Sequence, residues 1–159
     1  MMDDLPVWKR DPIGSAERGE NPTAIVRMRS GWALLGWQQF LPGYSLLLGV
    51  PKYARLEDMP RDVRAVFLDD MGLLGEAVAK ACSPRRVNYS VYGNTDPHVH
   101  AHVVPRYDWE PPERVVMPIW QYPMETWSAP EHAFDDKKHA GLKQKIADAL
   151  REIMPSVAR

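Results

Sequence analysis

The chain has 159 residues, enough for one domain with a buried core and too few for two. Twenty basic and twenty-one acidic side chains leave a formal net charge of −1 without long runs of like charge, so nucleic acid is not an expected partner. The start lacks a basic segment followed by an apolar one, and the longest apolar runs are only strand-sized. We therefore expect a cytoplasmic protein that does not engage a membrane.

The first half of the chain begins with three strand-like segments. Residues 23–29 and 32–38 are apolar and flank Ser30 and Gly31, a pair suited to a tight turn, which predicts a β-hairpin. Residues 46–50 are apolar at nearly every position. This pattern predicts a third strand that is buried on both faces.

The rest of the chain alternates helix and strand patterns. Apolar residues at steps of three and four predict an amphipathic helix over 58–82. Period-two patterns predict a pair of strands at 87–93 and 98–105, and residues 106–134 are loop-like. The helical period returns over 135–155.

This order of elements, with its short connections, predicts an α+β fold in one domain that spans residues 1–159. We expect a mainly antiparallel, five-stranded sheet and two helices.

The segment "HVHAHVVP" holds three of the five histidines of the chain, at every second position. Side chains alternate between the two faces of a strand, so His98, His100 and His102 should share one face while valine and alanine line the other. An apolar back face that packs on the core would hold the three imidazoles in place.

Three kinds of chemistry fit three imidazoles on one face. They could bind a metal ion, although further ligands are scarce in this sequence. They could be structural, although three neighbouring titratable rings are costly to place side by side. They could act on phosphate, because a neutral imidazole is a nucleophile toward phosphorus and its neighbours can donate hydrogen bonds to phosphate oxygens.

The motif "HVHAHVVPR" resembles the signature of the histidine-triad family of nucleotide hydrolases and transferases. The wider stretch "YGNTDPHVHAHVVPRY" is similar to the form found in bacterial members related to diadenosine tetraphosphate hydrolases, and "FLPGYSLLLGVPKY" resembles an earlier strand of the family. The resemblance covers residues 20–107, and residues 108–159 form a C-terminal loop and helix.

The resemblance implies a homodimer that cleaves a nucleotide or dinucleoside polyphosphate at its α-phosphate. It implies that His100 is the nucleophile, that His102 contacts the phosphate and that His98 orders the site. A backbone carbonyl that accepts from Nδ1–H of His100 would leave Nε2 free to attack. The alternatives are a nucleotidyl or phosphoryl transferase with a non-water acceptor and a non-catalytic module that binds a nucleotide or a metal.

The resemblance also implies substrate contacts outside the triad. Asn94 and Thr95 stand where relatives contact phosphate, although both residue types also favour turns. Gln39 stands where relatives contribute to the ribose pocket, and an ordinary strand position is its alternative.

Three further positions complete the implied site. Many relatives have a histidine at the position of Tyr44, whose phenol can still donate a hydrogen bond. Trp120 and Trp127 lie in the region that completes the pocket in relatives, or they pack as ordinary hydrophobic residues. The zinc ligands of some branches are missing, so we expect no metal and no cofactor.

Overall fold

Five antiparallel strands form a single sheet in the computed structural model, which describes residues 4–157. The strand order is β1-β2-β3-β5-β4. The strands are β1 (Ala24–Arg27), β2 (Gly31–Leu35), β3 (Ser45–Gly49), β4 (Arg86–Ser90) and β5 (His100–Arg106). The α-helices are α1 (Val7–Arg10), α2 (Pro12–Glu17), α3 (Arg61–Cys82), α4 (Pro112–Val115), α5 (Met124–Ser128) and α6 (Asp136–Ile153). Short 3₁₀ turns occupy Leu56–Asp58, Ile119–Gln121, Pro130–His132 and Pro155–Val157.

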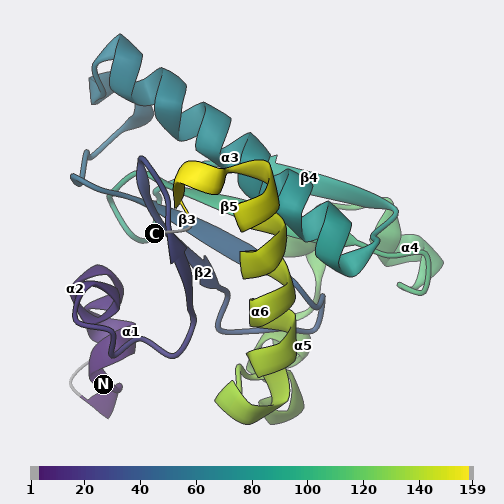
Figure 1. Cartoon of the computed structure of the whole chain (residues 1–159). Helices are drawn as coiled ribbons and strands as arrows, with labels where there is room; N and C mark the ends of the chain where they lie inside the picture. The colour runs from purple at the N-terminus through teal and green to yellow at the C-terminus, as the bar shows by residue number, and fades with distance from the viewer. Residues whose placement is uncertain (1–3, 158–159) are drawn as a thin grey trace.

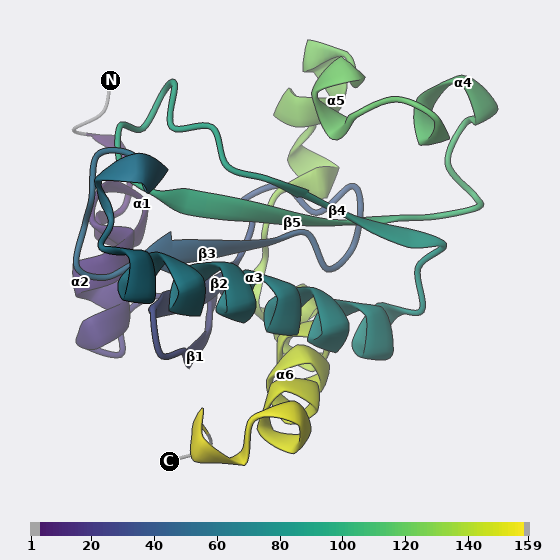
Figure 2. The same cartoon turned by 90° about the horizontal axis from the view of Figure 1, so that it is seen from above.

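The two long helices cover one face of the sheet, where α3 contacts β3, β4 and β5 and α6 packs against α3 (Figure 1). The segment that contains α4 and α5 lies on the opposite side of β4 and β5 (Figure 2). Within residues 4–157, no helix combines the length and the apolarity that a bilayer crossing requires.

The core lies between the sheet and the long helices. Leu47 on β3, Ala101 and Val103 on β5, and Phe67 and Leu74 on α3 are all fully buried in one cluster. Every second residue of β5 therefore packs on α3, because side chains alternate along a strand. The other face of β5 is left for the histidines.

The predicted α+β fold with its antiparallel sheet and two long helices is confirmed, and the observed limits of α3 and α6 lie close to the predicted ones. The short helices α1, α2, α4 and α5 were not predicted. Each has only four to six residues, too few for the helical period to stand out.

Three local predictions are corrected. Gly31 belongs to β2 instead of the turn, and a Cβ atom there would lie 1.9 Å from the carbonyl oxygen of Leu48, so close strand packing requires glycine. The last strand begins at His100, so His98 lies in the preceding loop, and the fourth strand ends at Ser90 instead of residue 93.

A buried carboxylate ties the connection between β1 and β2 to helix α3. Asp70 is fully buried and accepts hydrogen bonds from the backbone N–H and the hydroxyl of Ser30, at 2.8 and 2.7 Å. The guanidinium of Arg29 pairs with the same carboxylate and with the exposed Asp69. Because a buried charge is costly unless it is paired, this contact helps to fix the position of the hairpin.

We predict that Asp70→Ala lowers the free energy of unfolding by about 3 kcal/mol, because it leaves the Ser30 donors without their buried acceptor. The neighbouring variant Asp69→Ala removes an exposed partner of the same arginine and should cost less than about 1 kcal/mol. Urea denaturation followed by circular dichroism measures both, and equal losses would contradict the assignment.

Candidate active site

The three histidines lie together, although only two of them are in the strand. His100 and His102 project from the face of β5 opposite the core, with ring centroids 4.9 Å apart. The His98 ring lies 5.4 Å from that of His100. The structure thus brings all three imidazoles together, with His98 placed by a loop and the other two by the pleat of the strand.

The loop position of His98 gives it two distinct contacts. Its Nδ1 lies 2.6 Å from Oδ1 of Asp96, and since an ionised carboxylate only accepts hydrogen bonds, this nitrogen carries the proton. Its backbone carbonyl accepts from Nδ1 of His100 at 2.8 Å. The buried Nε2 of His98 has no hydrogen-bond partner among residues 4–157.

The contact to the His98 carbonyl selects the tautomer of His100. A carbonyl oxygen can only accept, so Nδ1 of His100 must carry the proton. The lone pair of a neutral His100 is therefore on Nε2. His100 also lines two cavities, so the nitrogen with the lone pair belongs to a ring that borders open space.

Tyr44 selects the tautomer of His102. Its hydroxyl lies 2.7 Å from Nδ1 of His102 and its side chain is buried. Burial raises the pKa of the Tyr44 phenol far above its ordinary value. Burial, and to a lesser degree the charge of His100, lower the pKa of His102 to about 4. At neutral pH the phenol therefore donates to Nδ1, and Nε2–H of His102 remains as a donor.

Two cavities flank His100 and His102, and both are lined by these two histidines and Asp96. One, of about 470 Å³, is also lined by Asn94 and Thr95, so these two predicted residues lie beside the histidines. The other, of about 280 Å³, has three leucines in its lining together with Tyr44 and Trp127. The leucines are Leu34, Leu46 and Leu48.

Gln39 is not part of either cavity. The buried side chain donates to the carbonyls of Gly36 and Tyr44 at 2.9 and 2.8 Å and accepts from the N–H of Gly43 at 3.0 Å. These contacts shape the loop that presents Tyr44. The neighbouring Gln38 lines the smaller cavity instead, and its buried Oε1 has no partner within the described part of the chain.

Aromatic residues from the segment after β5 cover the histidines. Trp120 and Trp127 are stacked with centroids 5.6 Å apart, and Trp120 meets the edge of His102 at 4.9 Å. Tyr92 and Asp96 were not singled out from the sequence. Their place in the histidine loop is the only sequence signal that could have suggested them.

The described residues contain no group of three His, Cys, Asp or Glu side chains arranged to hold a metal ion. The chemistry available to the site is that of an imidazole nucleophile with a neighbouring imidazole donor, beside an apolar cavity.

We predict that Tyr44→Phe changes the tautomer of His102, because Nδ1 loses the donor that now occupies it. Nitrogen-15 NMR of the imidazoles should show only the Nε2–H form in the wild type and a mixture in the variant. Tyr53→Phe is the control, because Tyr53 is partly buried against the core between the sheet and α3. A Tyr44→Phe protein that keeps the pure Nε2–H form would contradict this role.

The low pKa of His102 also predicts a pH-dependent stability. Between pH 6.5 and 4 the unfolded chain binds a proton at residue 102 that the folded protein does not bind, so the free energy of unfolding falls as the pH drops through this range. From pH 7 to 4.5 the loss from this group is about 2 kcal/mol. His102→Gln should remove that part of the loss in urea titrations, and an identical pH dependence in both proteins would disprove it.

Comparison with known proteins gives structural matches only. No family model matches the sequence, and no curated protein is similar to it. A histidine-triad protein from Sinorhizobium meliloti matches with a TM-score of 0.66 at 16% identity, over 84% of this chain and 93% of that one. A hypothetical histidine triad nucleotide-binding protein from Sulfolobus tokodaii matches with a TM-score of 0.67 at 12% identity, over 89% of this chain and 91% of that one.

The diadenosine triphosphate hydrolase of Plasmodium falciparum, solved with cyclomarin A, matches with a TM-score of 0.50 at 12% identity, over 85% of this chain and 78% of that one. Identities this low carry information about architecture alone. Together with the five-stranded sheet and the histidine face of β5, they show that this chain has the histidine-triad fold.

Proposed function

We propose that this protein is a histidine-triad nucleotide hydrolase or transferase. It acts at the α-phosphate of a dinucleoside polyphosphate or a related nucleotide through a covalent nucleotidyl-His100 intermediate. The observation that carries this proposal is the hydrogen bond from Nδ1 of His100 to the His98 carbonyl, because it leaves the Nε2 lone pair available to a phosphorus atom. The solved proteins of the same fold, one of them named as a nucleotide-binding protein and one as a hydrolase, support it.

In the first step, Nε2 of His100 attacks the α-phosphorus. A P–N bond to His100 forms, and the bond from phosphorus to the leaving group breaks with its electrons on the departing atom. That atom is an oxygen of a polyphosphate or the nitrogen of a phosphoramidate, and the nitrogen takes a proton from solvent. The imidazole becomes positively charged, and the His98 carbonyl stabilises the N–H that carries this charge. Nε2–H of His102 donates to a phosphate oxygen as negative charge develops there.

In the second step, water or another acceptor attacks the same phosphorus. A P–O bond forms, the P–N bond breaks, and its electrons return to Nε2 of His100. The acceptor loses its proton to solvent. Hydrolysis and transfer differ only in the acceptor, so analysis of the products in the presence of added alcohols or phosphates separates them.

The nucleoside is proposed to bind in the smaller cavity. The leucines at 34, 46 and 48 form a row beside the histidines, since Leu46 pairs with His102 and Leu48 with His100 across β3 and β5. A purine or pyrimidine ring gains from such an apolar surface and from the indole of Trp127. Asn94 and Thr95 are proposed to donate to the phosphate from the loop on the other side. The homodimer and the cytoplasmic location stay predictions.

We predict that His100→Ala lowers turnover of diadenosine tetraphosphate and of adenosine phosphoramidate by at least about a thousandfold, because no other group supplies the nucleophile. His132→Ala is the matched control, since His132 packs on Phe40 away from both cavities. Chromatography of the products, with and without a chelator, measures the rates. Undiminished turnover in a folded His100→Ala protein would contradict the proposal.

A further inference from the structure

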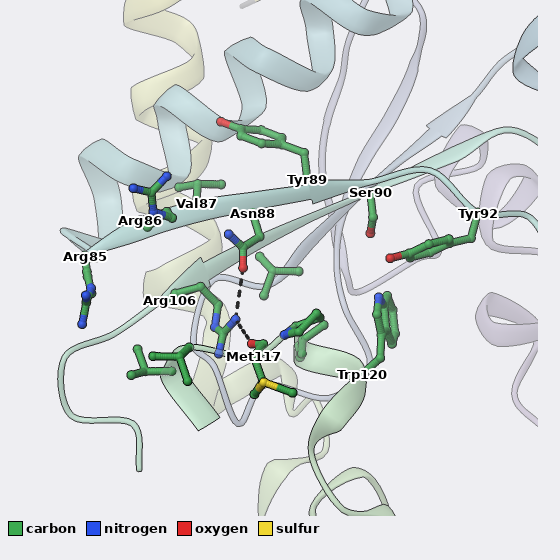
Figure 3. Close-up of a pocket in the computed structure, with 15 residues that line it drawn as sticks. Arg85, Arg86, Val87, Asn88, Tyr89, Ser90, Tyr92, Arg106, Met117 and Trp120 are labelled. Atoms are coloured by element: carbon green, nitrogen blue, oxygen red, sulfur yellow. Dashed lines mark hydrogen bonds between the residues drawn. The ribbon is translucent and has the colours of Figure 1, made fainter. Parts of the chain in front are cut away.

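A third cavity, of about 700 Å³, adjoins the histidine site on the side of β4 (Figure 3). It shares Tyr92 and Trp120 with the 470 Å³ cavity that contains His100 and His102. Its floor is formed by β4 and the end of β5, and its wall by residues 115–120. We call this space the β4 groove. It borders the site at Tyr92 and Trp120, whose rings are in edge-to-face contact with centroids 5.7 Å apart.

The floor of the β4 groove is the same face of the sheet that carries the histidines. In an antiparallel pair, residues directly opposite each other point to the same side. Ser90 is opposite His102, and Arg86 is opposite Arg106, with Asn88 between them on β4. A row of polar side chains therefore runs along β4 from the histidines for four residues, about 13 Å.

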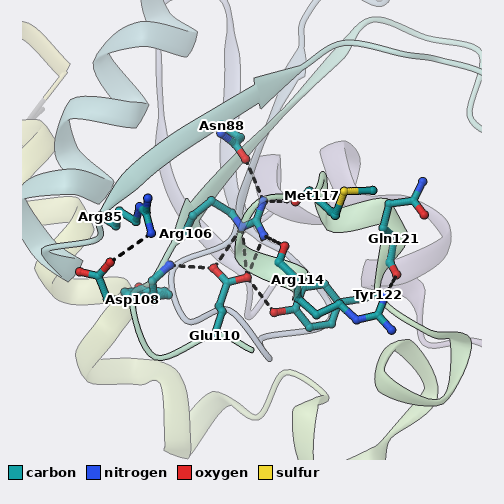
Figure 4. A network of polar contacts seen from close by, with 10 residues as sticks. Arg85, Asn88, Arg106, Asp108, Glu110, Arg114, Met117, Gln121 and Tyr122 are labelled. Atoms are coloured by element: carbon teal, nitrogen blue, oxygen red, sulfur yellow. Dashed lines mark hydrogen bonds and ion pairs between the residues drawn. The ribbon is translucent and has the colours of Figure 1, made fainter. Parts of the chain in front are cut away.

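Most of the charge around the β4 groove is already paired, as Figure 4 shows. Arg106 is buried and forms an ion pair with the buried Glu110 at 2.8 Å. It also donates to Oδ1 of Asn88 and to the carbonyls of Arg114 and Met117, which fastens the wall to the floor. This network is structural and contributes no net charge.

The donors that remain free lie on β4 and increase in charge away from the histidines. Within residues 4–157, the Ser90 hydroxyl, the Nδ2 amide of Asn88 and the guanidinium of Arg86 have no hydrogen-bond or ion-pair partner. Arg85 lies beside them but pairs with Asp108 at 3.5 Å. The β4 groove thus offers two neutral donors and, at its far end, one uncompensated cation.

We infer that the β4 groove holds the leaving group of the reaction, and that this group is an extended anion such as the phosphates of a second nucleotide. The inference rests on the proposed function, because the histidines define where the leaving group begins. The apolar cavity lies on the β3 side of the histidines and the polar row on the β4 side. A small neutral amine in the same position would make no use of the free donors or of Arg86.

The test compares two leaving groups in the same enzyme. kcat/KM is measured for diadenosine tetraphosphate and for adenosine phosphoramidate, in the wild type, Arg86→Gln and Arg86→Glu. We expect the ratio of the tetraphosphate value to the phosphoramidate value to fall about fivefold in Arg86→Gln, the size of one exposed charge contact, and further in Arg86→Glu. Salt should weaken the preference in the wild type and have less effect in Arg86→Gln.

Arg61→Gln is the matched control, because Arg61 is an exposed arginine at the start of α3, and α3 packs on the opposite face of the sheet (Figure 2). It should leave the ratio within twofold of the wild-type value. A ratio in Arg86→Glu that also stays within twofold overturns the inference. Equal losses with both substrates overturn it as well, since they would indicate a general structural effect.

A binding measurement separates this inference from the proposed function. In the His100→Ala background, calorimetry compares the Kd of diadenosine tetraphosphate with that of AMP. We expect the tetraphosphate to bind more tightly, and Arg86→Glu to remove at least about fivefold of that advantage. Absence of any advantage overturns the β4 groove assignment even if His100 proves to be the nucleophile. If Arg86→Glu removes the advantage while the protein with His100 intact does not turn over diadenosine tetraphosphate, the result supports the groove and counts against the mechanism.

Discussion

Strand β5 is hydrogen-bonded on both edges, to β3 and to β4, and its small residues Ala101 and Val103 are fully buried in the core that the sheet forms with α3. This constraint sets the rest of the site. A strand that is fixed on both edges and packed on one face can neither slip nor rotate, because a shift by one residue would exchange its two faces. His100 and His102 are thereby held on the outer face. The neighbours across the strands give that face an apolar side and a polar side.

Hydrogen bonds then give each imidazole a different role. His100 donates to a backbone carbonyl and keeps its lone pair at Nε2, whereas His102 accepts from a phenol and keeps a proton at Nε2. One contact each thus leaves two chemically identical side chains with a lone pair at Nε2 of His100 and an N–H donor at Nε2 of His102. Tyr44 suits its role because burial keeps it protonated, so the donor does not titrate near neutral pH.

The sequence predicts the sheet, the long helices and the histidine face, because each rests on a period that extends over many residues. Burial of β5 follows from alternation in the same way. The loop position of His98 could not be predicted in this way, because a strand and an extended loop have similar sequence patterns at the end of a strand. Gln39 shows a second limit: its three backbone contacts depend on a loop conformation that no local pattern encodes.

The β4 groove could not be predicted from the sequence for a related reason. Its wall comes from the segment after β5, and the pairing of Arg106 with Glu110 and with two carbonyls of that segment decides which charges stay free. Proline-rich segments with helices of four or five residues give no periodic signal. The resemblance drew attention to the two tryptophans there, but only the structure places them beside His102.

If His100 is the nucleophile, phosphorus becomes bonded to its Nε2 during turnover, and this bond can be detected directly. The protein is mixed with radiolabelled diadenosine tetraphosphate, quenched within milliseconds under alkaline conditions that preserve phosphoimidazoles, digested and sequenced by mass spectrometry. We expect an adenylyl group on the peptide that contains residues 98–102, located on His100 and absent from His100→Ala. An adduct on another residue, or rapid turnover with no adduct in the quenched protein, would contradict it.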